Sequence, residues 1–259
     1  MRAMHTSLMV AVVAVLVGLA AQVVLADWDV GDPFKMHKPQ LPDMNGLDVN
    51  FMDPKVLADD WQCTQSGAVS DIHFWFSSRQ DQPFNIQNVH LSIHKDIPAA
   101  ENPLGQYSMP AEPALWQMDI PGPEVQVRWW GEGPQGWFDP NTQELILQDH
   151  LNVWQANIVR IPNPFIQEKG TIYWLDVSVN AISPTGGPAM LGWKTSMEHF
   201  NDDATWTDII AGANMDWQEL RDPRSGESLD LAFVITPEPA TMALMGLGVA
   251  GILARRRRR

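Results

Sequence analysis

Apolar and polar residues alternate along much of the chain between residues 71 and 235. An alternation with a period of two is typical of β-strands that bury one face. The clearest segments are 71–76, 89–94, 125–130, 153–161, 173–179 and 229–235, with a shorter one around 145–147. Between the two termini no segment has a sustained helical period, although residues 208–220 have room for one short helix. The pattern therefore predicts an all-β fold.

Clusters of proline, glycine and asparagine separate these segments, at 121–123, 131–134, 139–141, 162–164 and 184–188. Such residues favour turns, because proline removes a hydrogen-bond donor and glycine tolerates unusual backbone angles. Seven or more short strands with loops between them predict an antiparallel β-sandwich, similar to a jelly roll, as a single domain over residues 58–236. Residues 27–57 contain four prolines and no sustained period, so we expect an extended N-terminal arm, with room for a strand near Val49–Met52.

The N-terminal end has the pattern of a secretory signal peptide. Arg2 and His5 precede an apolar run from Leu8 to Leu25, and a small residue, Ala26, ends the run. This order of a charged start, an apolar stretch and a small-residue cleavage site is typical of exported proteins. We therefore expect a signal helix over residues 1–26, cut by signal peptidase between Ala26 and Asp27.

The C-terminal end has three parts. Pro237, Glu238 and Pro239 follow the last predicted strand and end the folded domain, because proline cannot continue a strand ladder. An apolar run over 240–254 predicts a hydrophobic helix, shorter than the roughly 20 residues of a full membrane span. The chain then ends in the basic cluster Arg255, Arg256, Arg257, Arg258 and Arg259, which stays on the cytoplasmic side of a membrane.

This tail, residues 237–259, resembles the PEP-CTERM sorting signal of Gram-negative-type bacteria. The resemblance implies transient insertion into the inner membrane, and then recognition and cleavage near the motif by an exosortase-type transpeptidase. It also implies a final location at the cell surface or in the extracellular matrix. The alternative is an ordinary C-terminal anchor helix followed by a basic stop.

The segment between the two ends is strongly acidic. The whole chain has 17 Lys and Arg against 31 Asp and Glu. Without Arg2, the five terminal arginines and Glu238, residues 27–236 keep 11 basic and 30 acidic side chains, a net charge of −19. Such a surface repels nucleic acid and anionic lipid, so we exclude nucleic acid as a partner. Cys63 is the single cysteine, so no intrachain disulfide can form and stability must come from packing.

The central segment also carries several tryptophan-containing motifs. They include Ala58-Asp59-Asp60-Trp61-Gln62-Cys63, Asp71-Ile72-His73-Phe74-Trp75, Gln135-Gly136-Trp137-Phe138-Asp139-Pro140 and Gly192-Trp193-Lys194-Thr195. With these motifs, residues 55–236 resemble an uncharacterised domain family of exported bacterial proteins, chiefly planctomycete-like ones, that often end in a PEP-CTERM tail. That family has no assigned activity, so the resemblance implies no catalytic residues.

Calcium is the first candidate cofactor. Carboxylate oxygens are the ligands that calcium prefers, and the aspartates of the predicted loops are numerous. The candidate ligands are Asp59, Asp60, Asp202 and Asp203. No segment matches the EF-hand loop, and neighbouring aspartates also serve as solvated turn formers. The sequence leaves both interpretations open, and otherwise predicts no cofactor.

Three histidines, His73, His90 and His94, occupy the polar face of predicted strands, which is the kind of position that can hold zinc on a sheet. A sheet-face histidine is more often bound by a neighbouring carbonyl or carboxylate. Neither a cysteine partner nor a His-Glu-x-x-His motif accompanies them.

The twelve tryptophans raise the question of sugar binding, because exposed aromatic rings stack on sugar faces. Trp75, Trp130 and Trp174 fall opposite the aliphatic face of their predicted strands, and Trp137 falls in a predicted loop. We predict Trp130 and Trp137 as the candidate stacking residues. In the alternative, loops cover the outer face and these tryptophans form a second small core.

The sequence lacks the Gly-x-Ser-x-Gly, Gly-x-Gly-x-x-Gly and Walker-type motifs of common enzymes, and Cys63 has no protease signature. We therefore expect an exported, non-catalytic structural or interaction protein of the surface or matrix. The first alternative is a lectin-like module that binds extracellular polysaccharide, with or without calcium. The second is an extracellular enzyme acting on glycans, with paired carboxylates as its catalytic groups.

Overall fold

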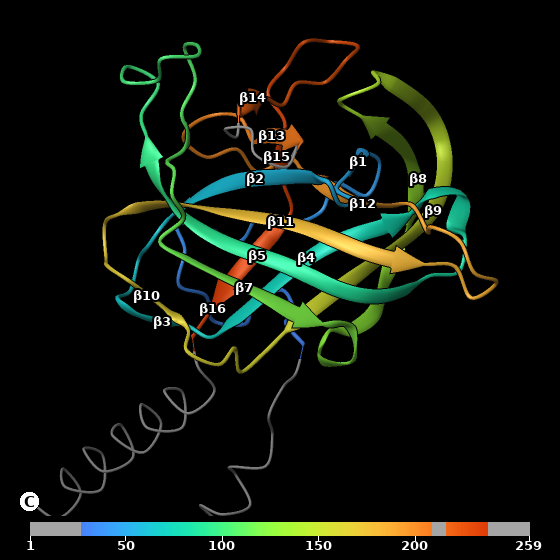
Figure 1. Ribbon diagram of the computed structural model, residues 1–259, viewed down its shortest axis with the longest axis horizontal. Coiled ribbons are helices and arrows are strands. Elements are labelled where there is room, and N and C mark those ends of the chain that lie inside the picture. Colours follow the sequence, from blue (N-terminus) through green and yellow to red (C-terminus); the bar gives the residue numbers. More distant parts are fainter. Residues whose placement is uncertain (1–26, 209–215, 238–259) are drawn as a thin grey trace, which may run out of the picture.

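The computed structural model describes residues 27–208 and 216–237 (Figure 1). These residues form strands and two single-turn 3₁₀ helices, Arg79–Asp81 and Gly122–Glu124, so the predicted all-β fold is confirmed. The signal helix expected over 1–26 and the hydrophobic helix expected after residue 239 lie outside the described residues. Within the described ranges, no helix has the length and apolar character needed to cross a membrane.

The first sheet has seven strands, and Figure 1 shows β2, β11, β5 and β7 side by side as one layer. Its order is β14 (Gln218–Glu219), β13 (Thr205–Asp208), β2 (Lys55–Gln62), β11 (Ile172–Ile182) and β5 (Asn85–Ile97). Both β6 (Met109–Pro110) and β7 (Trp116–Pro121) then pair with β5. Every pairing in this sheet is antiparallel.

The second sheet also has seven strands. Its order is β15 (Asp230–Leu231), β12 (Leu191–Ser196), β1 (Leu47–Asn50), β8 (Gln126–Asp139), β9 (Glu144–Ile158), β4 (Asp71–Ser78) and β16 (Phe233–Thr236). Because β12 also pairs with β4, the strands β12, β1, β8, β9 and β4 close into a ring. The pairing of β1 with β8 is parallel, so the purely antiparallel arrangement expected from the sequence is corrected here. A small separate sheet joins β3 (Gly67–Val69) to β10 (Phe165–Gln167).

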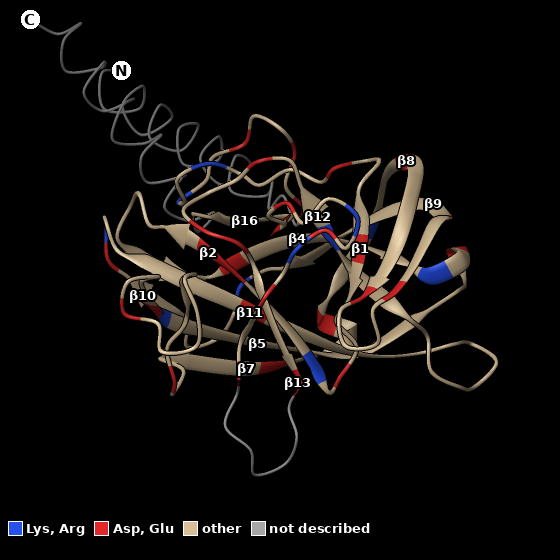
Figure 2. Ribbon diagram, turned by 90° about the horizontal axis from the view of Figure 1, so that it is seen from above, with Lys and Arg blue, Asp and Glu red and all other residues tan. Residues whose placement is uncertain are grey.

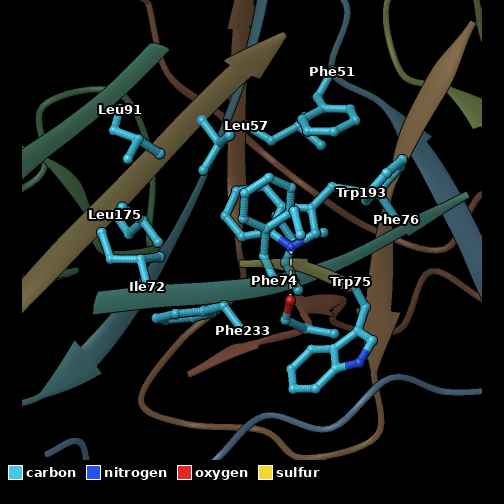
Figure 3. Packing of buried hydrophobic residues seen from close by; sticks show 14 of the residues in the cluster. Phe51, Leu57, Ile72, Phe74, Trp75, Phe76, Leu91, Leu175, Trp193 and Phe233 are labelled. Atoms are coloured by element: carbon cyan, nitrogen blue, oxygen red, sulfur yellow. Dashed lines mark hydrogen bonds between the residues drawn. The ribbon is translucent and has the colours of Figure 1, made fainter. Parts of the chain in front are cut away.

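The main core lies between the two large sheets. Leu57, Leu91 and Leu175 of the first sheet and Phe74 and Trp193 of the second belong to one cluster of fully buried side chains (Figure 3). The indole N–H of Trp193 donates a hydrogen bond to the backbone carbonyl oxygen of Ala232, between β15 and β16, at 2.9 Å. This bond satisfies the one polar atom that such a large apolar side chain carries into the core.

The segment expected to be an N-terminal arm belongs to the folded domain. All four residues of β1 are buried, and the strand is part of the ring, between β12 and β8. Trp28 and Met36 are also buried, and Met36 forms a β-bridge with Cys63. The strand allowed near Val49–Met52 is β1, which begins two residues earlier, and its burial shows no alternation because both of its faces are covered.

The strand β8 passes through residues 131–134, where the sequence predicted a turn. The register between β8 and β9 shifts at this point, so the strand bends without ending. A Cβ atom on Gly133 would lie 1.9 Å from the carbonyl oxygen of Met44, so the close approach of these two backbones requires glycine. The hairpin turns after Asp139, as the pattern at 139–141 predicted, and Asp139 Oδ1 accepts hydrogen bonds from the backbone N–H groups of Asn141 and Thr142.

Candidate functional site

A groove of about 670 Å³ lies where β5, β10 and β11 meet at one end of the first sheet. Asp96 and Glu168 place two carboxyl groups on its lining, and Phe165 and Tyr173 contribute aromatic rings. The two rings pack edge to face, with centroids 5.1 Å apart. Ile166 is 61% exposed at the same place. Because aromatic, apolar and carboxyl groups converge here, this groove is the candidate binding site of the domain.

A polar group lies beside the groove on the outer face of the same sheet. In the strand register, Trp174 of β11 is opposite Asp60 of β2 on one side and His94 of β5 on the other. The indole N–H of Trp174 donates to Asp96 Oδ1 at 2.8 Å, and His94 Nε2 lies 2.8 Å from Asp176 Oδ2. We call Asp60, His94, Asp96, Trp174 and Asp176 the outer-face cluster. Asp96 belongs to both the cluster and the groove.

Loops cover most of the outer-face cluster: Asp60, His94, Trp174 and Asp176 are buried, and Asp96 is partly buried. Trp174 belongs to a second small apolar core that also contains Met109 and Trp217, from the segments that cross this face. Tyr107 donates its hydroxyl proton to the backbone oxygen of Trp217 at 2.7 Å and so ties the two loops together. The alternative in which tryptophans form a second small core therefore holds for Trp174.

The pKa values of three groups in the outer-face cluster are shifted from their ordinary values. Burial raises the pKa of Asp60 well above the ordinary value, even though the Asn201 side chain donates to Asp60 Oδ2 at 2.6 Å. Burial also raises the pKa of Asp96. For His94, burial opposes the charged form, but the hydrogen bond to Asp176 and its charge outweigh burial and raise the pKa. His94 thus carries two N–H donors, one for Asp176 and one for the Ala111 carbonyl, and has no free lone pair for a metal.

The structure does not bring the three sequence-predicted histidines together. His73 lies on β4 in the second sheet, where burial lowers its pKa to about 4 and its ring contacts Asn157 and Thr236. His90 lies on β5 near His94, but its ring nitrogens contact Asp119 and Ser92. The zinc interpretation therefore has no shared site in the part of the chain that the structure describes.

The structure does not bring all four aspartates proposed as calcium ligands into one site. Asp59 points to the opposite side of β2 from Asp60, and both of its oxygens accept protein donors, including the N–H groups of Asp60 and Leu231 and the amide of Gln40. Asp202 is near the outer-face cluster, since Ser108 contacts both Asp202 and the Asn201 amide. Because both carboxylate oxygens of Asp59 already accept hydrogen bonds from the protein, Asp59 is poorly suited to hold a cation.

A tighter carboxylate group contains Asp202, Asp203 and Glu219, whose ligand atoms all lie within 4.8 Å of one another. Glu219 lies on β14, and sequence reasoning missed it because only the pairing of β14 with β13 brings it close. The guanidinium of Arg221 lies 2.8 Å from Asp203 and 2.5 Å from Glu219, so a cationic group already occupies this position. Burial and a hydrogen bond with Glu219 raise the pKa of Asp203 to about 7. Figure 2 shows how widely such acidic positions are spread over the domain.

The two tryptophans predicted to stack on sugar are not equivalent. Trp137 is fully buried on β8 and offers no face to a ligand, because the predicted loop is a strand of the ring. Trp130 is half-buried, packed edge to face on Trp75 at 5.1 Å, with the Arg128 guanidinium over its ring. The exposed ring belongs instead to Trp129, which is 53% exposed. The period-two pattern placed Trp129 on the aliphatic face with Val127, and both of these side chains are exposed to solvent.

The processing signals lie at the limits of the described chain. Asp27, the expected first mature residue, forms an ion pair with Arg128 at 3.0 Å. Pro237 is the last described residue. Ala26, Glu238, Pro239 and the arginines 255–259 lie outside the described residues.

Two family models match the chain. A model described as a domain of unknown function (DUF7901) matches residues 36–236. A model described as a PEP-CTERM protein-sorting motif matches residues 236–259. No curated protein matches the chain. The two matches meet at residue 236, where β16 ends and the Pro-Glu-Pro segment begins.

Proposed function

The chain belongs to the DUF7901 family and ends in a PEP-CTERM motif, which marks it for export through an exosortase-type system, and from this premise we propose that the domain is a non-catalytic structural component of the cell surface or extracellular matrix. The observation that carries the proposal is the burial of the tryptophan side chains. Six tryptophans are fully buried: Trp61, Trp75, Trp137, Trp174, Trp193 and Trp217. The large aromatic side chains thus stabilise a disulfide-free domain, which suits a protein that must persist outside the cell.

The outer-face cluster supports the same conclusion. Its charged groups make hydrogen bonds to one another, to neighbouring side chains or to backbone, and loops cover most of them, so they act as internal polar ties between strands and loops. A catalytic group needs contact with substrate, which the fully buried Asp60 does not have in this arrangement.

The experiment is done in exosortase-containing bacterial cells that produce the full chain with an epitope in the exposed 184–187 loop. The processed domain should be recovered from the surface and matrix fractions, and cells lacking the chain should show weaker aggregation or matrix retention. The purified protein should release no reducing sugar from that matrix. Sustained sugar release that is lost in both Asp96→Asn and Glu168→Gln would overturn the proposal in favour of a glycan-cleaving enzyme at the groove.

Polysaccharide binding is the second candidate, and the exposed ring of Trp129 is the observation that favours it. Its indole N–H is held by Asn152 Oδ1 at 3.1 Å, so the ring has a fixed orientation at the surface. Binding of the protein to an array of bacterial and algal polysaccharides, with calcium and then with chelator, tests it. Saturable binding that is lost in Trp129→Ala but kept in Trp116→Ala supports a lectin-like site, and loss on chelation adds calcium to that site. An array without saturable binding removes this candidate.

A further inference from the structure

A buried ion pair joins two strands of the ring of five, and neither of its residues lines the groove. Asp48 of β1 and Lys194 of β12 are directly opposite each other in the antiparallel register. Lys194 Nζ lies 3.0 Å from Asp48 Oδ2, and both side chains are fully buried. A Cβ atom on Gly192 would lie 2.9 Å from both the carbonyl carbon and the Cβ of Asp48, so β1 and β12 are packed tightly beside the pair.

A histidine completes the group. His150 of β9 places Nε2 at 2.8 Å from the same oxygen, Asp48 Oδ2, and Nδ1 at 3.0 Å from Asp149 Oδ2. Since both ring nitrogens face carboxylates, both act as donors. Burial opposes the charged ring, but the hydrogen bonds to Asp48 and Asp149 outweigh it and raise the pKa of His150. Asp48 Oδ2 therefore receives two donors.

The other oxygen of Asp48 is in a different situation. Oδ1 is buried and has no hydrogen-bond partner among the described residues. A buried ion pair with an unsatisfied carboxylate oxygen is costly, because both ions have lost their hydration. Burial also lowers the pKa of Lys194, which favours the neutral amine. A neutral amine in contact with a carboxyl group is a nucleophile beside an electrophile.

We propose that Lys194 Nζ and Asp48 Cγ condense within the folded domain into an intramolecular amide, an isopeptide bond between β12 and β1, with loss of one water molecule. A proton first passes from the ammonium to Asp48 Oδ2 along the existing hydrogen bond, which leaves an amine and a carboxylic acid. The nitrogen lone pair then attacks Cγ and forms the C–N bond. His150 donates its Nε2 proton to Oδ2, the Cγ–Oδ2 bond breaks, and water leaves.

The atoms and charges of this step balance, and no other reactant is needed. The attacking nitrogen releases one proton, which returns to His150 Nε2, so the imidazolium is regenerated. Two opposite charges disappear and a neutral amide remains, so the cost of burying the ions is removed. In water the same condensation is unfavourable because both groups stay ionised and hydrated. Inside the ring burial favours the neutral amine of Lys194, and the released water escapes to solvent.

The bond would give this chain a covalent brace that its cysteine content does not provide, since Cys63 is the single cysteine. It would join positions 146 residues apart and hold β1, from the N-terminal segment, to β12 near the end of the domain. Cross-links over long loops restrict the unfolded chain most strongly.

Peptide mapping of the purified full chain tests the proposal. Trypsin does not cut before Pro39, so Asp48 lies in the peptide 36–55, and Lys194 ends the peptide 170–194. An acylated Lys194 is no longer a cleavage site. The expected product is therefore peptide 36–55 joined to peptide 170–221, with the summed mass of the two less one water, and with fragment ions that locate the link at Asp48 and Lys194.

The controls separate the cross-link from the ion pair. Lys194→Arg keeps the positive charge but not the amine, and should give peptide 36–55 unjoined. Asp48→Asn should give the same joined product as the natural chain, because ammonia then leaves in place of water. His150→Asn should slow joining at least tenfold after refolding from denaturant. Recovery of free peptides 36–55 and 170–194 as the main species from the natural chain, with no joined product growing on incubation, would overturn the proposal.

Discussion

His94 Nε2 lies 2.8 Å from Asp176 Oδ2, and each side chain is only 1% exposed. The pair joins β5 to β11, while His94 Nδ1 donates to the backbone oxygen of Ala111 in the covering loop. One ring therefore links two strands and a loop. Because the pair is shielded from water, the loss of either partner leaves a buried polar group unpaired.

The replacement His94→Gln tests how much this pair contributes to the free energy of unfolding. We expect a loss of about 3–5 kcal/mol in the free energy of unfolding, the range seen when one partner of a buried ion pair is removed. Denaturant titration followed by tryptophan fluorescence measures it. The matched control is His90→Gln on the same strand, whose ring is 29% exposed and pairs with the exposed Asp119. Its loss should be about 0–1 kcal/mol, and equal losses in the two variants would contradict the assignment.

Stability should fall as the pH rises from 6.5 to 8.5. The pKa of Asp203 is raised to about 7 by burial and by its hydrogen bond with Glu219, and the pKa of His94 is also raised. Both groups hold protons in the folded state that the unfolded chain has released, so stability is lost as the pH passes through the folded pKa values. His37 and His73, with a pKa of about 4, act in the opposite direction, but only below pH 6.5.

Unfolding measured by denaturant at several pH values checks this expectation. The variant Asp203→Asn should show a smaller decrease over the same range, because one of the titrating groups is gone. A free energy of unfolding that stays constant or rises between pH 6.5 and 8.5 would show that other groups dominate the pH dependence.

Two tryptophans on one strand should respond differently to truncation. Trp137→Ala removes a fully buried ring and should cost about 3–5 kcal/mol of folding stability. Trp129→Ala removes a ring that is 53% exposed, and should change stability by only about 0.5 kcal/mol. Thermal unfolding of both variants measures the difference. A large loss in Trp129→Ala would mean that its ring supports the fold and is a poor choice for a ligand contact.

Arg128 should fasten the N-terminal segment to the second sheet. Its guanidinium donates to the carbonyl oxygen of Trp28 at 2.6 Å and to Asp29 at 2.7 Å, and its Nε donates to Gln155. Arg128→Ala should speed amide hydrogen exchange in residues 28–36 while exchange in β11 stays slow. Arg160→Ala, at an exposed position, is the control. Unchanged exchange in residues 28–36 would show that packing of Trp28 holds the segment by itself.

The sorting motif should be separable from the fold. Replacing Pro237 and Pro239 by Ala should leave the domain folded but keep the chain in the membrane fraction, because the motif matched at 236–259 is altered. Immunoblotting of membrane and surface fractions measures the distribution. Pro184→Ala, in an exposed loop, is the control and should be sorted normally. Normal release of the doubly substituted chain would contradict a role for the motif.

Sequence periodicity succeeded where one face of a strand packs on the main core. The alternation at 71–76, 89–94 and 173–179 corresponds to β4, β5 and β11. It was misleading about the opposite face, because His73, Trp75 and Trp174 are buried as well. The N-terminal segment covers β4, and the loops with Met109 and Trp217 cover β11. A period of two distinguishes the two faces of a strand, but it carries no information on what lies above each face.

The candidate sites depended even more on long-range contacts. Asp202 and Asp203 are conspicuous in the sequence, but Glu219 and Arg221 reach them only through the pairing of β13 with β14. Asp48, His150 and Lys194 come from three strands of the ring, and no local pattern in the sequence connects the three residues.

The sequence by itself determined the C-terminal sorting signal, the all-β class and the absence of an intrachain disulfide. These properties depend on local order, such as an apolar run beside a charged cluster, on a period of two, or on a count. Only the tertiary structure decided that β1 is one strand of a closed ring, that Trp137 is buried while Trp129 is exposed, and that a lysine meets an aspartate away from water. Such outcomes depend on which segments pair across more than a hundred residues, and on the desolvation that follows when they do.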